Sequence, residues 1–173
     1  AARTAENLLA EALEDCEHDV NHPDFIGKQP LLRLIKMWSK TPESPAAAEG
    51  VWERLWKWYE QSGGNKRFKP DENFYKALLR AWMVSSKSTP HETAQRALQL
   101  WKSCLEQVAQ NPSIEFCYLV TMVVAKAGDV ESTESLVNKV IESYQSGQTH
   151  ERKDLDILSL LILAKCRAGQ LSG

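Results

Sequence analysis

The chain has 173 residues, of which 43% are hydrophobic and 25% charged, and its formal net charge is −2. This length suits one compact domain or a short repeat array, and the hydrophobic share is enough to bury a core. The near-neutral charge excludes a nucleic-acid binder that works through net positive charge alone. The sparse glycines (8) and prolines (7) lie between apolar stretches, which favours long helices over a many-stranded β fold.

The cysteine spacing indicates the redox compartment, and the length of the apolar runs indicates whether a segment could span a membrane. Cys16, Cys104, Cys117 and Cys166 have no paired short spacing, which is typical of free thiols in a reducing compartment and not of a disulfide framework or a zinc ribbon. The longest near-continuous apolar run, 157–164, is far shorter than the roughly 20 residues that cross a bilayer, so no membrane insertion is predicted. Without a starting methionine or a charged-then-apolar leader, the chain is expected to be a processed form or part of a longer protein.

Apolar periodicity predicts eight helices in chain order. Their expected ranges are 4–14, 30–40, 45–61, 71–85, 89–108, 113–127, 129–144 and 154–168. The third helix is expected to have Ser44 as its N-cap and Pro45 at its first position, and the fifth to begin with a capping box from Thr89 to Glu92. Gly128, Gly147 and Gly169 fall where helices end, at positions that favour a left-handed backbone.

The first five predicted helices each have an apolar stripe that is expected to form the core. In chain order the stripes are Leu8, Leu9, Ala12 and Leu13; Leu31, Leu34, Ile35 and Trp38; Ala48, Val51, Trp52, Leu55, Trp56 and Tyr59; Phe74, Leu78, Ala81 and Trp82; and Ala94, Ala97, Leu98, Trp101, Cys104, Leu105 and Val108. Five of the six tryptophans lie on these stripes, so core packing is favoured for them over base stacking. Trp58 lies off the stripe of its helix and is the exception.

The helices repeat in pairs. Alternate helices end at Pro42, Ser86, Gly128 and Gly169, spacings of 44, 42 and 41 residues. A period just above 40 with two helices per unit indicates an all-α solenoid of about 3.5–4 helix-turn-helix repeats, because each unit exposes an apolar face that only a neighbour can cover. We therefore expect residues 1–173 to form a single helical-repeat domain, with repeat boundaries near 29, 70, 112 and 153, that is part of a longer array.

Two middle segments carry a resemblance to a known family. Lys69–Trp82, KPDENFYKALLRAW, is followed by a helix with the motif ETAQRALQLW, and Cys117–Gly128 ends in the motif VAKAG before Asp129. These segments resemble pentatricopeptide repeats, and the Ala81-Trp82 pair is similar to divergent, lengthened repeats of the algal and protist type. The turns between helices are longer here than in that family. Tetratricopeptide-type units are the nearest alternative.

The resemblance implies single-stranded RNA binding in an organelle, a mitochondrion more than a plastid, with bases read by two side chains per repeat. Carried onto this chain, the first reading positions are Leu32, Lys76, Tyr118 and Ser159, and the second are Asp71, Ser113 and Asp154. The second set has the family's preferred residue types. In the first set only Ser159 is of a preferred residue type, and the Leu32 side chain cannot hydrogen-bond to a base. Base-by-base reading is therefore not expected.

Charge is unevenly divided between the two kinds of helix. The first-helix segments (28–40, 66–87, 112–128 and 151–169) hold 15 Lys and Arg against 6 Asp and Glu, and the remainder holds 6 against 17. Because first helices line one concave face of such solenoids, the sequence predicts a basic inner face that contacts RNA phosphates. The predicted RNA-binding residues are Arg33, Lys36, Lys40, Lys66, Arg67, Lys69, Lys76 and Arg80. A solvated face, or a contact for an acidic protein, is the alternative.

The last predicted helix is apolar around most of its circumference. A terminal repeat needs a polar outer side, so this helix is expected to be covered by further repeats or by a partner subunit through Ile157, Leu160, Leu161 and Leu163. Cover by the preceding helices is the alternative.

The sequence contains no recognisable catalytic or metal-binding motif. Cys16, His18 and His22 have a spacing that could suggest a metal site, but a fourth ligand is missing and a surface loop is favoured. No catalytic motif is recognised, so no metal, cofactor or enzymatic activity is predicted. With the uneven charge, the resemblance to pentatricopeptide repeats implies a binding module of an organelle RNA–protein assembly, such as a ribosome or an RNA-processing complex, with single-stranded or ribosomal RNA and protein subunits as partners. The alternative is a protein–protein scaffold without RNA contact.

Overall fold

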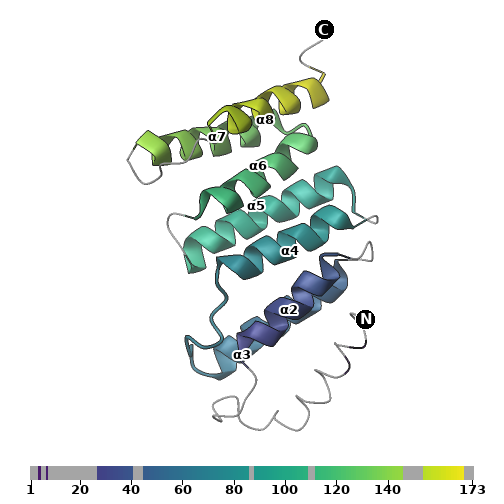
Figure 1. The fold of residues 1–173 in the computed structure, drawn as a ribbon, viewed down its shortest axis with the longest axis vertical. Coiled ribbons are helices and arrows are strands. Elements are labelled where there is room, and N and C mark those ends of the chain that lie inside the picture. Colours follow the sequence, from purple (N-terminus) through teal and green to yellow (C-terminus); the bar gives the residue numbers. More distant parts are fainter. Residues whose placement is uncertain are drawn as a thin grey trace. The chain divides into compact units, whose positions relative to one another are not determined.

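The computed structural model describes residues 4, 7, 27–40, 45–85, 88–108, 112–145 and 154–169, and for 143–145 and 154–157 it describes the backbone alone. Every regular element in these residues is helical (Figure 1). The helices are α2 (Lys28–Trp38), α3 (Ala46–Gln61), α4 (Glu72–Val84), α5 (Pro90–Gln107), α6 (Ile114–Lys126), α7 (Val130–Gln145) and α8 (Asp154–Arg167). This confirms the all-α class, and the bounds differ from the expected ones by no more than two residues. The predicted first helix lies outside the described residues, apart from Thr4 and Asn7.

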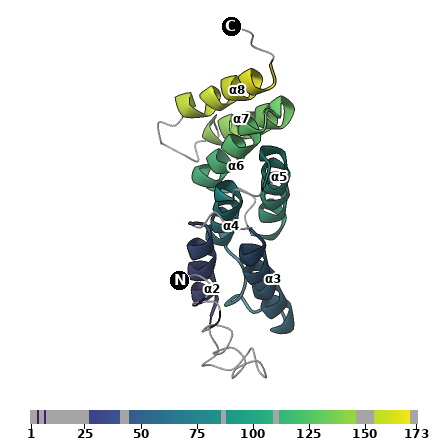
Figure 2. The same ribbon diagram turned by 90° about the vertical axis from the view of Figure 1, so that its right-hand side faces the viewer.

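The chain divides into two compact units, Ala1–Lys87 (unit 1) and Ser88–Gly173 (unit 2), and each is described by itself. In unit 1, α2 packs on α3 and α4, and α3 packs on α4. Figure 1 shows α2 and α4 running side by side in the same direction, and Figure 2 shows α3 in a second layer beside them. Among the largest fully buried side chains of this unit are Leu31, Phe68, Phe74 and Tyr75.

In unit 2, α6 is the central helix, because it packs on α5, α7 and α8. Its buried side chains cover most of its circumference, and Phe116, Val120 and Val124 are fully enclosed. α7 also packs on α8, so that α6, α7 and α8 form a three-helix cluster. None of the helices in the described part of the chain is both long and apolar enough to span a membrane.

Local signals in the sequence set most of the helix ends. Thr89 Oγ1 accepts a hydrogen bond from the Glu92 N–H at 3.2 Å, and the Glu92 carboxylate accepts from the Thr89 N–H at 2.7 Å, which confirms the predicted capping box. Gly128 ends α6 with a φ of +78°, and Gly169 follows α8 with a φ of +71°, a backbone region that glycine adopts without steric cost. Gly147 lies outside the described residues.

The start of α3 differs from the expectation. The helix begins at Ala46, and Pro45 precedes it with helical angles, its carbonyl accepting from the Glu49 N–H at 3.0 Å. Pro45 has no side-chain donor or acceptor with which to cap this end, and the expected cap Ser44 lies outside the described residues.

The core of α3 also differs from the predicted stripe. Trp58, which periodicity placed off the stripe, is only 5% exposed, whereas Trp56 is half-buried. The reason lies beyond the helix: the chain returns after α3 and places the Phe68 ring edge-on against Trp58, with centroids 6.1 Å apart. In α5 the buried face likewise includes Leu100, while Leu98 and Leu105 are half-buried, because α6 packs on one side of the predicted stripe.

Candidate nucleic-acid interface

The candidate site lies on α2 and α4 of unit 1, and Lys28 joins the starts of these two helices. Its ammonium donates to the Lys69 carbonyl at 2.9 Å and forms an ion pair with Asp71 Oδ2 at 2.9 Å. Since α2 and α4 run in the same direction, this contact sets their register. Arg33 and Lys76 each lie five residues beyond the joined ends, about 7.5 Å along their helices, so they are level with each other.

The same register brings Lys36 level with Arg80 in the next turn. Arg33, Lys36 and Arg80 are exposed, as is Lys40 just beyond the end of α2. The faces of α2 and α4 opposite to them are buried, through residues such as Leu34 and Leu78. The exposed sides of two adjacent, parallel helices therefore carry basic side chains at matching heights. Four of the eight predicted residues, Arg33, Lys36, Lys40 and Arg80, are exposed, and of these Lys36 and Arg80 lie at nearly matching heights.

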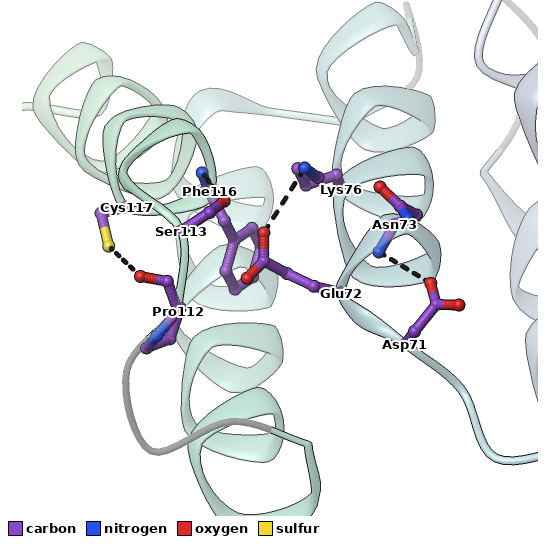
Figure 3. Close-up of polar contacts among 8 residues, drawn as sticks. All are labelled: Asp71, Glu72, Asn73, Lys76, Pro112, Ser113, Phe116 and Cys117. Atoms are coloured by element: carbon purple, nitrogen blue, oxygen red, sulfur yellow. Dashed lines mark hydrogen bonds and ion pairs between the residues drawn. The ribbon is translucent and has the colours of Figure 1, made fainter. Parts of the chain in front are cut away.

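Lys76 is placed differently from the other residues of this group. Its ammonium lies 3.4 Å from Glu72 Oε1, one turn earlier in α4, and its side chain is only 15% exposed (Figure 3). Glu72 is itself 19% exposed, so part of the positive charge is neutralised where it stands. Lys76 is therefore less accessible at the surface than Arg33 or Arg80, whose side chains are exposed.

The three remaining predicted residues lie in the segment 62–70, between α3 and α4. Phe68 anchors this segment, because its side chain is completely buried. The Asn65 side chain accepts from the Arg67 N–H at 3.0 Å, and the Phe68 N–H donates to the Asn65 carbonyl at 3.0 Å, which closes a turn. Lys66 and Arg67 are exposed on this turn, whereas Lys69 is half-buried. The segment is thus an ordered turn with two exposed cations.

Arg67 also connects this turn to α2. Its guanidinium lies over the Phe68 ring, 5.8 Å from the centroid. A Cβ at Gly27, directly before α2, would stand 3.4 Å from Arg67 Nε. The basic turn and the start of α2 are therefore neighbours, and Lys66 and Arg67 extend the charged surface beyond the helix ends.

The base-reading positions that the resemblance implies have structural roles here. Leu32 is buried with 6% of its surface exposed. Asp71 Oδ1 accepts from the Asn73 N–H at 3.0 Å and caps α4, and Ser113 Oγ caps α6 by accepting from the Phe116 N–H at 3.3 Å (Figure 3). Asp and Ser are the residues that helix N-caps prefer, so capping alone explains their occurrence at these positions.

The other reading positions lie in unit 2. Tyr118 is half-buried against the cluster formed by Ala125, Leu160 and Ala164. Ser159 is exposed, and the Asp154 side chain lies outside the described residues. Glu115 and Lys126 are the only charged residues in α6, so the basic surface of α2 and α4 has no counterpart on that helix.

The predicted partner-facing residues of α8 are only partly accessible. Leu160 is 5% exposed and packs with Ala125 and Ala164, so it belongs to the core of unit 2 and is not a docking residue. Leu161 and Leu163 are half-buried, and the Ile157 side chain lies outside the described residues. The exposed apolar side chains are instead Leu158 (46%) and Ile162 (58%), which sequence reasoning did not single out. They lie one turn apart on the side opposite to Leu160 and Ala164, and the sequence alone does not show which of these two sides is exposed.

Potential metal ligands do not gather in the described residues: no three of their His, Cys, Asp and Glu side chains form a group that could hold an ion. Cys16, His18 and His22 lie outside them. Compared with known protein families, with curated proteins and with solved structures, the chain matches none.

Proposed function

We propose that this chain is a non-catalytic binding module of an organelle RNA–protein assembly, and that it contacts the phosphate backbone of single-stranded or ribosomal RNA through its basic surface. The observation that carries the proposal is the parallel pair α2 and α4, with Lys36 and Arg80 exposed at nearly matching heights and Arg33 exposed one turn before Lys36. Arginines and lysines on one face, joined by Lys66 and Arg67 on an ordered turn, are the electrostatic footprint of a phosphate-binding surface.

The proposed architecture is a pentatricopeptide-like solenoid. Its support is the period above 40 residues together with the contacts inside each unit, where alternate helices, α2 with α4 and α6 with α8, pack on one another as first helices of successive repeats do. The resemblance adds the expected compartment, a mitochondrion before a plastid. Binding through phosphates, with Leu32 buried and Asp71 and Ser113 used as caps, would be nearly independent of base sequence.

A second candidate is a protein–protein scaffold without RNA contact. The observation in its favour is the exposed pair Leu158 and Ile162 on α8, because exposed apolar side chains that form a contiguous patch mark surfaces that bind other proteins.

Purification of the tagged protein from its native source, with and without ribonuclease, tests the RNA proposal. We expect RNA in the untreated sample and release of assembly partners after ribonuclease treatment. The variant Arg33→Gln, Lys36→Gln and Arg80→Gln should lose most of the RNA, because each substitution removes an exposed cation from the proposed surface.

The matched control neutralises three exposed lysines on other helices, Lys57→Gln on α3, Lys102→Gln on α5 and Lys139→Gln on α7. It changes the net charge by the same amount and should keep its RNA. If both triple variants lose RNA equally, net charge and not the α2–α4 surface governs binding. If the native protein carries no RNA and its partners resist ribonuclease, the scaffold is the better account.

A further inference from the structure

The exposed side of α2 carries a continuous row of cations. Arg33, Lys36 and Lys40 follow one another at i, i+3 and i+7, which places them on one side of the helix, and all three are exposed. Residues 27–40 include no aspartate or glutamate. Within the part of the chain that the structure describes, none of these three cations forms an ion pair. The row therefore keeps its full charge along the length of the helix.

The row continues past the start of α2 onto the basic turn. A Cβ at Gly27, directly before the helix, would stand 3.4 Å from Arg67 Nε, so the turn that carries the exposed Lys66 lies at this end. The other end is marked by Lys40, just beyond the last turn of α2. Exposed cations thus extend from one end of the helix to the other.

Charge is much sparser in the direction across the helices. On α4, Lys76 is only 15% exposed and paired with an acid one turn earlier, which leaves Arg80 as the exposed cation of that helix. Arg80 lies nearly level with Lys36, so it flanks the row from the side. The only charged residues of α6 are Glu115 and Lys126. A polyanion that follows α2 therefore meets more cations than one that crosses successive first helices.

We propose that a single RNA strand follows α2 lengthwise and that the site holds about five nucleotides. The path rests on the proposed function, to which it adds a direction and a length. α2 has 11 residues and is therefore about 16 Å long. Nucleotides stacked as in one strand of a duplex rise about 3.4 Å each, so the helix is about as long as five of them. Lys66 and Lys40 contact the two ends of this segment, and Arg33 and Lys36 contact its middle, with Arg80 beside them.

Binding of 5′-phosphorylated oligouridylates of about two to twelve nucleotides measures the length of the site. The slope of the logarithm of the association constant against that of the salt concentration should steepen by about 0.7 with each added phosphate. It should reach about −3.5 at about five nucleotides and then stay constant, because further phosphates meet no cation. A slope that is already constant from about two nucleotides, or that still steepens at about ten, overturns the proposal.

Two double variants with the same change of charge test the direction of the path. Lys40→Gln with Lys66→Gln removes the ends of the row, so the slope should level off near −2.1 at about three nucleotides. Arg33→Gln with Lys36→Gln removes the middle and keeps the ends, so the slope should again level off near −2.1 but only at about five nucleotides. All four side chains are exposed, so the unfolding midpoint should change little in both variants.

Failure of the path and failure of the proposed function give different results. If the longest oligouridylate binds with a steep salt dependence but both double variants level off at the same length, RNA binding stands and the lengthwise path is wrong. If that oligouridylate does not bind at low salt, the proposed function is refuted, and the path with it.

Discussion

Phe68 is the buried side chain on which the basic turn depends, and its truncation tests how the turn is held. Phe68 has no exposed surface and packs edge-on against Trp58, with ring centroids 6.1 Å apart. Phe68→Ala removes the buried ring and leaves a cavity, a change that costs about 3–5 kcal/mol in protein cores. The ring also lies below the Arg67 guanidinium, so the substitution removes that contact as well.

Urea denaturation followed by tryptophan fluorescence measures the cost. Five of the six tryptophans (Trp38, Trp52, Trp56, Trp58 and Trp82) lie in unit 1, so the signal reports mainly on the unit that contains Phe68. With a denaturant slope of about 1.5 kcal/mol/M, we expect the midpoint to fall by about 2–3 M. Val84→Ala, at a 44% exposed position, is the control and should shift it by less than about 0.5 M. A Phe68→Ala midpoint equal to that of the control would refute the anchoring role.

Three further predictions concern unit 2. Trp101→Ala should lower the free energy of unfolding by about 3–5 kcal/mol, because Trp101 is 7% exposed and packs 5.9 Å from the Phe116 ring; an unchanged midpoint in calorimetry would contradict this. Gly128→Ala should destabilise by at least about 1–2 kcal/mol in the same measurement, because φ is +78° and the added Cβ would lie 3.3 Å from the Arg167 backbone. Hydrogen bonds from the Thr89 backbone N–H and, to a smaller extent, from its hydroxyl lower the pKa of Glu92 in the folded state. This contact therefore stabilises the fold at pH values above the ordinary pKa of a glutamate, and the stabilisation is lost as the pH falls through the lowered pKa. Thr89→Ala should raise that pKa towards its ordinary value in a carboxyl NMR titration and cost about 1 kcal/mol of stability, and an unmoved pKa would show that the hydroxyl has no part in it.

Local chemistry explains why the helix ends could be predicted from the sequence. The capping box at Thr89 and the left-handed glycines at 128 and 169 act within a few residues, so the sequence alone contains the interaction. The apolar stripes were predicted wherever a helix packs through its own most hydrophobic side. The stripe of α3 was not, because Trp58 is buried by Phe68, ten residues later and beyond a turn that periodicity does not describe.

In the candidate site, too, features that depend on a single helix could be predicted, and contacts between residues distant in the sequence could not. Exposure of Arg33, Lys36 and Arg80 could be predicted, since each lies opposite to a buried stripe on its own helix. The role of Lys28 could not, because it depends on the Lys69 carbonyl and Asp71, 41 and 43 residues away. Similarly, Leu160 and Ile162 are both apolar residues of one helix, and only the position of α6 decides that the first is buried and the second exposed.

The central claim is that exposed cations on α2, α4 and the adjoining turn bind RNA phosphates, and the salt dependence of RNA binding tests it most directly. If Arg33, Lys36, Lys40, Lys66 and Arg80 each contact a phosphate, five contacts to single-stranded RNA predict a slope of about −3.5 for the logarithm of the association constant against that of the salt concentration. The variant Arg33→Gln, Lys36→Gln and Arg80→Gln should reduce the slope to about −1.4, whereas neutralising Lys57, Lys102 and Lys139 should leave it near −3.5. Equal slopes for the two triple variants, or no binding to single-stranded RNA at low salt, would contradict the claim.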